Sequence, residues 1–280
     1  RARQAAAPTF SLVSGGTSVA ALFMAGYIPG ALWALACMLV VYIYAKKAGY
    51  RSQTKLTGKE KFNAFIQALP CLLLIVIVIG GIIAGVFTAT EGSVVAVVYS
   101  LLLSIYGYKS MKWKDLPEIF RASAEMTGII IFLIGVSSIM SWVMAFTNIP
   151  TMVSNGLLSI SSNKYVILLM INIILLVVGT FMDMTPATLI FTPIFLPVCT
   201  ALGMNTIHFG IMLIFNLCIG TITPPVGTTL FVGVKVGGVK IETVFKHLLP
   251  YFFAIIVVLM LVTYIPQLSL WLPGLMGYVS

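Results

Sequence analysis

The chain has 280 residues, of which 60% are hydrophobic and only 8% are charged. This composition leaves too little polar surface to enclose a water-soluble globule of this size, so the sequence predicts an all-α polytopic protein in a lipid bilayer. The formal net charge of +9 comes from basic residues in short loops between apolar stretches, a pattern that membrane topology explains better than nucleic-acid binding.

In chain order, no cleavable signal peptide is recognisable at the start, and Arg1 looks like the interior end of a fragment. We therefore expect the true N-terminus to be missing. Apolar stretches follow that predict helices, with polar or turn-rich pieces between them. They are approximately Ala20–Ala45, Phe65–Val86, Gly92–Tyr106, Met126–Phe146, Tyr165–Gly179, Ala187–Leu202, Ile207–Val234 and Tyr251–Leu268.

Basic residues concentrate in three loops, which we expect to be cytoplasmic. Thirteen of the 16 Lys and Arg residues lie there, and only Arg1, Arg3 and Lys164 lie elsewhere. The stretches Tyr165–Gly179 and Ala187–Leu202 have about 15 residues each, short for a crossing of about 20. They therefore favour a re-entrant hairpin that enters and leaves on the outer side, although two full crossings would fit the charges equally well.

A weak internal repeat supports a symmetric design. Gly15, Gly16, Val19, Leu22, Phe23 and Pro29 recur, with one residue of slippage, as Gly237, Gly238, Ile241, Val244, Phe245 and Pro250. The helices that follow the two copies are expected to run in opposite directions, which indicates an inverted repeat. The second repeat would then be complete in this chain and the first truncated.

The segment Ile207–Val234 contains a predicted helix break at Thr221–Gly227, with two consecutive prolines, Pro224 and Pro225. The prolines remove two N–H donors and clash with the preceding turn, so carbonyl groups around Gly220–Thr223 lose helical partners. Freed backbone is tolerated at membrane depth only inside protein or beside a watery cavity, and transporters commonly use it to bind a cation.

The turn of the predicted hairpin, Gly179–Ala187, is the second candidate element, with Thr185 as expected N-cap and Pro186 as first helical residue. We predict a Na⁺ site between this turn and the helix break. Its predicted ligands are oxygen atoms of Gly179, Thr180, Asp183, Thr185, Asn216, Gly220, Thr221 and Thr223. Alternatively, Asp183 complements the helix dipole, Thr185 only caps the helix and Asn216 braces the hairpin; Asn172 is left out of the site.

Other polar residues favour structural interpretations. Thr88 or Thr90 with Glu91 predicts a helix cap, the alternative being gating or proton transfer by Glu91. Cys37, Cys71, Cys199 and Cys218 lack metal-ligand spacing, and His208 and His247 have no Asp or Cys nearby in sequence. With no phosphate-binding loop and no clustered acids or nucleophile with its base, we expect no enzyme, neither an ATPase nor a lipid-modifying one.

Several runs resemble the large membrane subunit of TRAP (tripartite ATP-independent periplasmic) transporters. They are Gly179–Pro197, His208–Ile211, Asn216–Gly227, Gly80–Ile82 with Gly85–Glu91, and Thr263–Pro273, and the likeness covers nearly the whole chain. The resemblance implies a sodium-coupled elevator-type importer in the bacterial inner membrane. It also implies three partners: a small four-helix membrane subunit, a periplasmic substrate-binding protein and a small carboxylate, namely a sugar acid, a sialic acid or a dicarboxylate.

On this view residues 1–62 end the first repeat and form a scaffold helix, and 63–123 form a returning helix pair with a cytoplasmic amphipathic segment. Residues 124–247 belong to the transport domain, with the hairpin at 163–203 and the broken helix at 206–236, and 248–280 form a second scaffold helix. The substrate would contact the half-helix termini and the break, at Pro186, Pro224, Pro225, Gly227 and Thr228. The open alternatives are proton coupling through Asp183 or Glu91, and a membrane subunit without a transport role.

Overall fold

The computed structural model describes residues 2–49, 57–161, 163–224, 227–239 and 241–278, and all regular structure in these ranges is helical. Seven helical segments of this part of the chain are long and apolar enough to cross a membrane. They are Val19–Lys47, Gly58–Ile82, Thr90–Gly107, Trp113–Val136, Lys164–Phe181, Met184–Ala201 and Val244–Tyr264. The prediction of an all-α, multi-pass membrane protein is therefore confirmed.

The chain forms two compact units, Arg1–Lys47 with Ile130–Ser280, and Ala48–Ile129. The first contains α1 (Ala2–Val13), α2 (Val19–Ala25), α3 (Tyr27–Ala48), α7 (Ile149–Ile160), α8 (Lys164–Phe181), α9 (Met184–Ala201), α10 (Thr206–Gly220), α11 (Thr228–Gly237), α12 (Ile241–Tyr264) and α13 (Gln267–Leu275). The second contains α4 (Gly58–Ile83), α5 (Ala89–Leu102), a π-helical turn at Leu103–Gly107 and a 3₁₀ turn at Trp113–Asp115. Helix α6 (Leu116–Phe146) runs from the second unit into the first.

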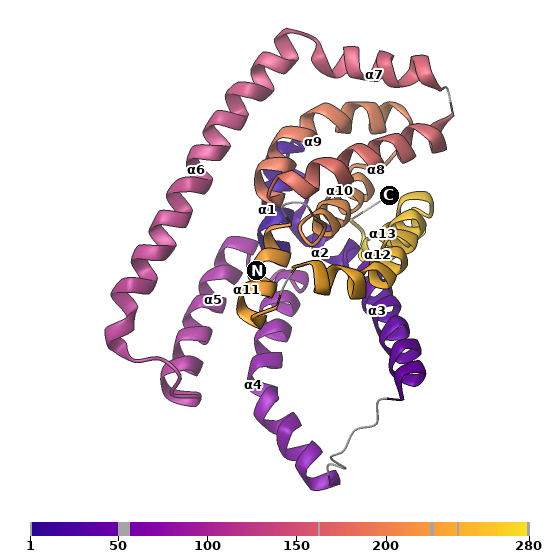
Figure 1. The fold of residues 1–280 in the computed structure, drawn as a ribbon. Helices are drawn as coiled ribbons and strands as arrows, with labels where there is room; N and C mark the ends of the chain where they lie inside the picture. Colours follow the sequence, from indigo (N-terminus) through magenta and orange to yellow (C-terminus); the bar gives the residue numbers. More distant parts are fainter. Residues whose placement is uncertain (1, 50–56, 162, 225–226, 240, 279–280) are drawn as a thin grey trace. The chain divides into compact units, whose positions relative to one another are not determined.

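Helix α10 is the centre of the first unit. Its sequence has no Asp, Glu, Lys or Arg, and it packs against α1, α2, α8, α9, α12 and α13 (Figure 1). Phe209, Met212, Leu213 and Leu217 have no exposed surface. A helix that is apolar on all sides is stable only when protein or lipid surrounds it, and here neighbouring helices do so.

The second unit is built around the antiparallel pair α4 and α5. Thr88 and Glu91 form the expected capping box at the start of α5: the Thr88 N–H donates to Glu91 Oε2 (2.8 Å) and the Glu91 N–H to Thr88 Oγ1 (3.3 Å). The Tyr99 hydroxyl donates to the carbonyl oxygen of Pro70 in α4 (2.9 Å). The prediction of a cap at this turn is confirmed.

Three helices have no counterpart among the predicted apolar stretches: α1, α7 and α13. Each has 12 residues or fewer, so none reaches the length on which the prediction of membrane spans depended. Helix α1 nevertheless contributes Phe10, which is fully buried against Phe209 of α10 with ring centroids 6.0 Å apart. Short helices thus complete the core around α10.

Candidate functional site

Helices α8 and α9 form the predicted hairpin, and Met182 and Asp183 make its tip in extended backbone conformation. Each helix has 18 residues, about 27 Å at 1.5 Å per residue, and each qualifies as a membrane span. The predicted length of about 15 residues was therefore wrong, because Lys164, Thr180 and Phe181 extend α8 and Met184–Pro186 extend α9. Length alone does not distinguish a re-entrant hairpin from two crossings.

The start of α9 also differs from the prediction. Asp183 occupies the N-cap position and Met184 is the first helical residue, so Thr185 is not the cap and Pro186 is the third helical residue. Proline fits there because the N–H groups of a first helical turn have no intrahelical acceptor. Asp183 is exposed, and Thr185 and Pro186 are partly buried.

The predicted helix break is confirmed on the described residues. Helix α10 ends at Gly220, α11 begins at Thr228, and the chain between them is irregular. Some of the expected free carbonyl groups have partners within the chain: Gly220 O accepts from the Thr223 N–H (2.9 Å) and Thr221 O from the Thr229 N–H (3.0 Å). Pro225 lies outside the described residues, as does the side chain of Thr228.

The hairpin touches the break through backbone atoms. A Cβ atom added to Gly220 would lie 2.5 Å from Cα and C of Gly179, and one added to Gly179 would lie 3.1 Å from Cα of Gly220. The Gly227 N–H donates to the carbonyl oxygen of Thr180 (3.3 Å). Gly227 has φ +40°, in the left-handed region that favours glycine. The structure therefore brings Gly179, Thr180, Gly220 and Gly227 together.

Three of the predicted threonine ligands share one hydrogen-bond arrangement. Oγ1 of Thr180 donates to Val177 O (2.7 Å), that of Thr221 to Cys218 O (2.8 Å) and that of Thr223 to Ile219 O (2.7 Å). A hydroxyl has one proton and two lone pairs, so donation to the preceding turn leaves the oxygen able to accept a hydrogen bond or bind a cation. These hydroxyl groups are suitable ligands for a hard cation.

Asn216 braces the hairpin, as one of its two predicted roles requires. Its Nδ2 donates to Asn172 Oδ1 (2.8 Å) and to Asn172 O (3.0 Å) on α8, and both side chains have no exposed surface. Asn172 Nδ2 donates in turn to Leu168 O (2.8 Å) and to Oγ1 of Thr263 on α12 (3.2 Å). Asn216 Oδ1 has no hydrogen-bond partner among the described residues, so this oxygen keeps its lone pairs for another donor or a cation.

Sequence reasoning missed Asn172 and Thr263 as parts of this polar network. The signal for Asn172 was present, because an amide inside an apolar helix needs a partner at membrane depth. Thr263 lies 91 residues further along the chain, and no local pattern connects it to Asn172. No group of three or more His, Cys, Asp or Glu residues suited to a metal occurs in the described ranges.

Comparison with known proteins identifies relatives of this sequence. Residues 6–268 match the family described as "Tripartite ATP-independent periplasmic transporter, DctM component". The chain is 52% identical over 266 residues to the uncharacterized protein YgiK of Salmonella typhimurium. This alignment covers 95% of this chain and 61% of YgiK.

Other relatives carry functional names, among them two TRAP transporter large permease proteins. Identity is 38% over 267 residues to the sialic acid TRAP transporter large permease protein SiaM of Vibrio cholerae, covering 95% of this chain and 62% of SiaM. It is 37% over 261 residues to the C4-dicarboxylate TRAP transporter large permease protein DctM of Pseudomonas aeruginosa, covering 93% of this chain and 61% of that protein. The chain thus spans about three fifths of these relatives' length.

Proposed function

Because the chain belongs to the DctM family of tripartite ATP-independent periplasmic transporters, we propose that the whole protein imports a small organic acid by sodium-driven secondary transport. It is a multi-pass membrane protein with seven candidate spans in the described ranges and is a transport protein rather than an enzyme. The substrate class rests on relatives named for sialic acid and C4-dicarboxylates. The proposed location is the bacterial inner membrane.

The observation that carries the sodium proposal is the contact between hairpin and break. Backbone of Gly179 and Thr180 lies against Gly220 and Gly227, and the hydroxyl oxygens of Thr221 and Thr223 stand on the same broken segment. Oxygen atoms from two elements meeting at a helix interruption suit a monovalent cation. A bound Na⁺ would hold the tip of α8 and α9 against the break; Asp183 and Thr185, at the tip, are proposed further ligands.

The substrate is proposed to bind next to this ion. The first turn of α9 presents the N–H groups of Met184 and Thr185, and that of α11 presents the N–H of Thr228; these groups have no intrahelical acceptor and attract a carboxylate. We propose that α8–α11 move as a transport domain against scaffold helices, the elevator arrangement, and that an inverted repeat supplies the other half of the site. The proposed partners are a small four-helix membrane subunit and a periplasmic substrate-binding protein.

Proton coupling remains the competing mechanism, with Asp183 or Glu91 as carrier. The structure gives Glu91 a defined task, because its carboxylate accepts hydrogen bonds from the N–H and the hydroxyl of Thr88. Asp183 is the stronger candidate for a carrier, since it lies at the hairpin tip. The two mechanisms differ in the gradient that drives uptake.

The experiment is transport by the full-length complex, including its small membrane subunit and binding protein, in proteoliposomes. We expect uptake of a labelled organic acid to follow an inward Na⁺ gradient at fixed pH and to stop without Na⁺. Replacing both Thr221 and Thr223 by Val should raise the Na⁺ concentration for half-maximal uptake at least about tenfold. Each change removes a hydroxyl ligand of the ion, while valine keeps nearly the shape of the threonine side chain.

Thr200→Val is the matched control. Its hydroxyl also donates to preceding turns, at Leu196 O and Pro197 O (both 3.0 Å), but it lies near the other end of α9. Uptake by this variant should keep the wild-type Na⁺ dependence. Uptake that follows a proton gradient without Na⁺ would refute the sodium proposal.

A further inference from the structure

The end of α3 meets the start of α12 through an aromatic contact. Tyr44 Oη lies 3.4 Å from His247 Nδ1, and the two rings meet edge to face, with centroids 6.1 Å apart and planes at 87°. The two residues are 203 positions apart in the sequence, and both belong to the first unit. The contact therefore holds the end of one candidate membrane span beside the start of another.

Three exposed lysines stand beside this contact. Lys46 and Lys47 lie in the last turn of α3. Lys246 directly precedes His247 in α12. No ion pair to any of the three occurs in the described parts of the chain, and Glu242 is the only acidic residue of the two helices. The place where α3 and α12 meet is therefore positively charged.

Helix dipoles and membrane topology account for only part of this arrangement. The negative end of the α3 dipole stabilises Lys46 and Lys47. Lys246 lies in the second turn of α12, near the positive end of that helix, where a cation gains nothing from the dipole. Topology requires basic residues on the cytoplasmic side, but it does not require lysines of two helices to meet. The described helices thus give Lys246 no stabilising partner.

Each helix continues from its lysine into an exposed apolar stripe. The members of a stripe have the three- or four-residue spacing of one helix face: Leu39, Ile43 and Lys47 on α3, and Lys246, Leu249 and Phe253 on α12. The four apolar side chains are exposed, and Phe253 has 73% of its surface free. A lysine at the end of such a stripe can extend its ammonium group to the membrane surface while its stem covers apolar atoms.

The ring contact turns both stripes to the same side. The two helices are expected to run in opposite directions, as predicted for the inverted repeat. Ile43 directly precedes Tyr44, Lys246 directly precedes His247, and one residue corresponds to a rotation of about 100° around a helix axis. In two opposed helices, equal steps back from the contact residues point to one side of the pair. The lysines therefore converge above one apolar surface.

We propose that this surface binds an anionic phospholipid. Lys46, Lys47 and Lys246 hold the headgroup phosphate, and the acyl chains lie along the two apolar stripes. Basic pockets between membrane helices on the cytoplasmic side bind anionic headgroups. A zwitterionic headgroup brings its own cation beside the phosphate, and a free phosphate leaves the stripes uncovered, so both fit less well. The inference requires only a membrane protein and does not rest on the proposed transport function.

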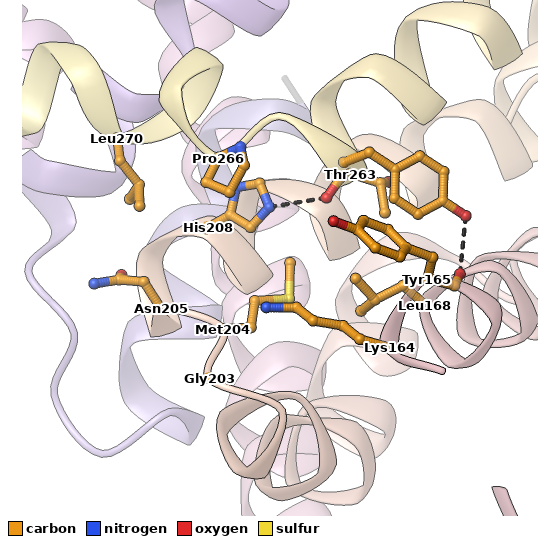
Figure 2. A pocket seen from close by; sticks show the side chains of 11 residues that line it. Lys164, Tyr165, Leu168, Gly203, Met204, Asn205, His208, Thr263, Pro266 and Leu270 are labelled. Carbon is orange, nitrogen blue, oxygen red and sulfur yellow. Dashed lines mark hydrogen bonds between the residues drawn. The ribbon is translucent and has the colours of Figure 1, made fainter. Parts of the chain in front are cut away.

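Lys164, in the same unit, lacks this arrangement. It lines a cavity of about 220 Å³ at the start of α8, where its side chain extends beside Met204 (Figure 2). The residues that line this cavity include no other Lys or Arg. A single lysine attracts a phosphate less strongly than three, so Lys164→Gln serves as a control for the loss of one charge elsewhere in the unit.

Photocrosslinking tests the proposal on the full-length protein in a neutral detergent. The probe is phosphatidylglycerol with a diazirine in its acyl chain, and peptide mass spectrometry locates and counts the crosslinks. We expect crosslinks along the stripes of α3 and α12. Unlabelled phosphatidylglycerol should compete at a concentration at least about tenfold lower than phosphatidylcholine, because each lysine near the surface contributes about fivefold to the attraction of anionic lipid. Glycerol 3-phosphate, which has no acyl chains, should compete only weakly.

Substitutions identify the cations. Replacing Lys46, Lys47 and Lys246 together by Gln should reduce crosslinking at the stripes at least about tenfold. Replacing the same three by Arg keeps the charge and should preserve crosslinking. The matched control replaces three lysines of another basic loop by Gln, namely Lys109, Lys112 and Lys114. This control and Lys164→Gln should leave crosslinking at α3 and α12 at the wild-type level.

An equal loss of crosslinking in the control with three substitutions would mean a general attraction between basic loops and lipid, and would overturn the proposed site. Equal competition by phosphatidylcholine would overturn the assignment of an anionic headgroup. Equal competition by glycerol 3-phosphate would overturn lipid as the ligand. Loss of crosslinking in the Arg variant as well as in the Gln variant would show that charge does not hold the headgroup.

Discussion

Gly179 of α8 and Gly220 at the end of α10 lie backbone to backbone, and neither has a Cβ atom that would hold the two helices apart. We predict that Gly220→Ala destabilises the protein by about 1–3 kcal/mol or more, because its Cβ would lie 2.5 Å from the backbone of Gly179 and backbone cannot move aside as a side chain can. The measurement is thermal unfolding of the purified protein in detergent, together with uptake by the complex.

Gly128→Ala in α6 is the control for this substitution. A Cβ atom there meets no other atom within 4 Å, and alanine inside a helix is favoured over glycine by about 0.5–1 kcal/mol. This variant should be at least as stable as the wild type. If Gly220→Ala were equally stable, α8 and the break would not be in contact in the membrane.

The pair Asn172 and Asn216 links α8 to α10 by side-chain hydrogen bonds without exposed surface. Replacing one asparagine leaves a buried amide group of the other without its hydrogen-bond partner, whereas replacing both leaves neither amide unpaired. A double-mutant cycle with Asn172→Leu and Asn216→Leu should therefore give a coupling energy of about 0.6–1.7 kcal/mol, between the average and the maximum found for hydrogen bonds between membrane helices. The observable is the unfolding free energy of the four proteins, and additive effects would show that the two amides do not interact.

At the scale of elements, α8 and α9 either turn back within the membrane or cross it twice. For the re-entrant arrangement we predict that cysteines replacing Asn163, before α8, and Asn205, before α10, both react with an impermeant maleimide added outside cells. A cysteine replacing Lys47, at the end of α3, should react only after permeabilisation, because basic loops stay inside. Cys37, Cys71, Cys199 and Cys218 must first be replaced to remove the background.

The discriminating position is the hairpin tip. Cysteine at Asp183 should be poorly labelled from outside if the hairpin ends inside the membrane against the break. Labelling from the cytoplasmic side alone, as efficient as that of Lys47→Cys, would instead support two full crossings.

The sequence predicted the elements whose signals are local. The capping box of Thr88 and Glu91 and the break at the proline pair each depend on residues within a few positions. The start of α9 was misplaced by two residues, because Asp183, Thr185 and Pro186 all suit a helix N-terminus and only the structure selects among them. Contacts between Gly179 and Gly220, or between Asn172 and Thr263, depend on how helices pack, which no local pattern encodes.

At the scale of the whole molecule, the second unit exposes large apolar side chains that water would not tolerate. Val76 in α4 is 65% exposed and lies well inside the helix, so we interpret it as facing lipid or a partner subunit. Val76→Lys should make membrane insertion of this segment less favourable by about 2.5–3.5 kcal/mol, the cost of a lysine at the centre of a spanning helix. A glycosylation-based insertion assay measures this directly.

Phe62→Lys is the matched control, since Phe62 is also 65% exposed but stands near the start of α4. A lysine there can extend its ammonium group to the membrane surface, so insertion should change little. Equal effects of the two substitutions would show that α4 does not cross the bilayer with Val76 near its middle.

The bond between the Thr180 carbonyl and the Gly227 N–H joins hairpin and break through main-chain atoms. A hydrogen bond between main-chain atoms does not depend on which side chains surround it, provided that Gly179 and Gly220, where the backbones pack closely, stay small. Related proteins can therefore change the side chains around this hydrogen bond while the main-chain contact between hairpin and break stays the same. The geometry of this contact and the chemistry of the surrounding side chains can in this way vary independently.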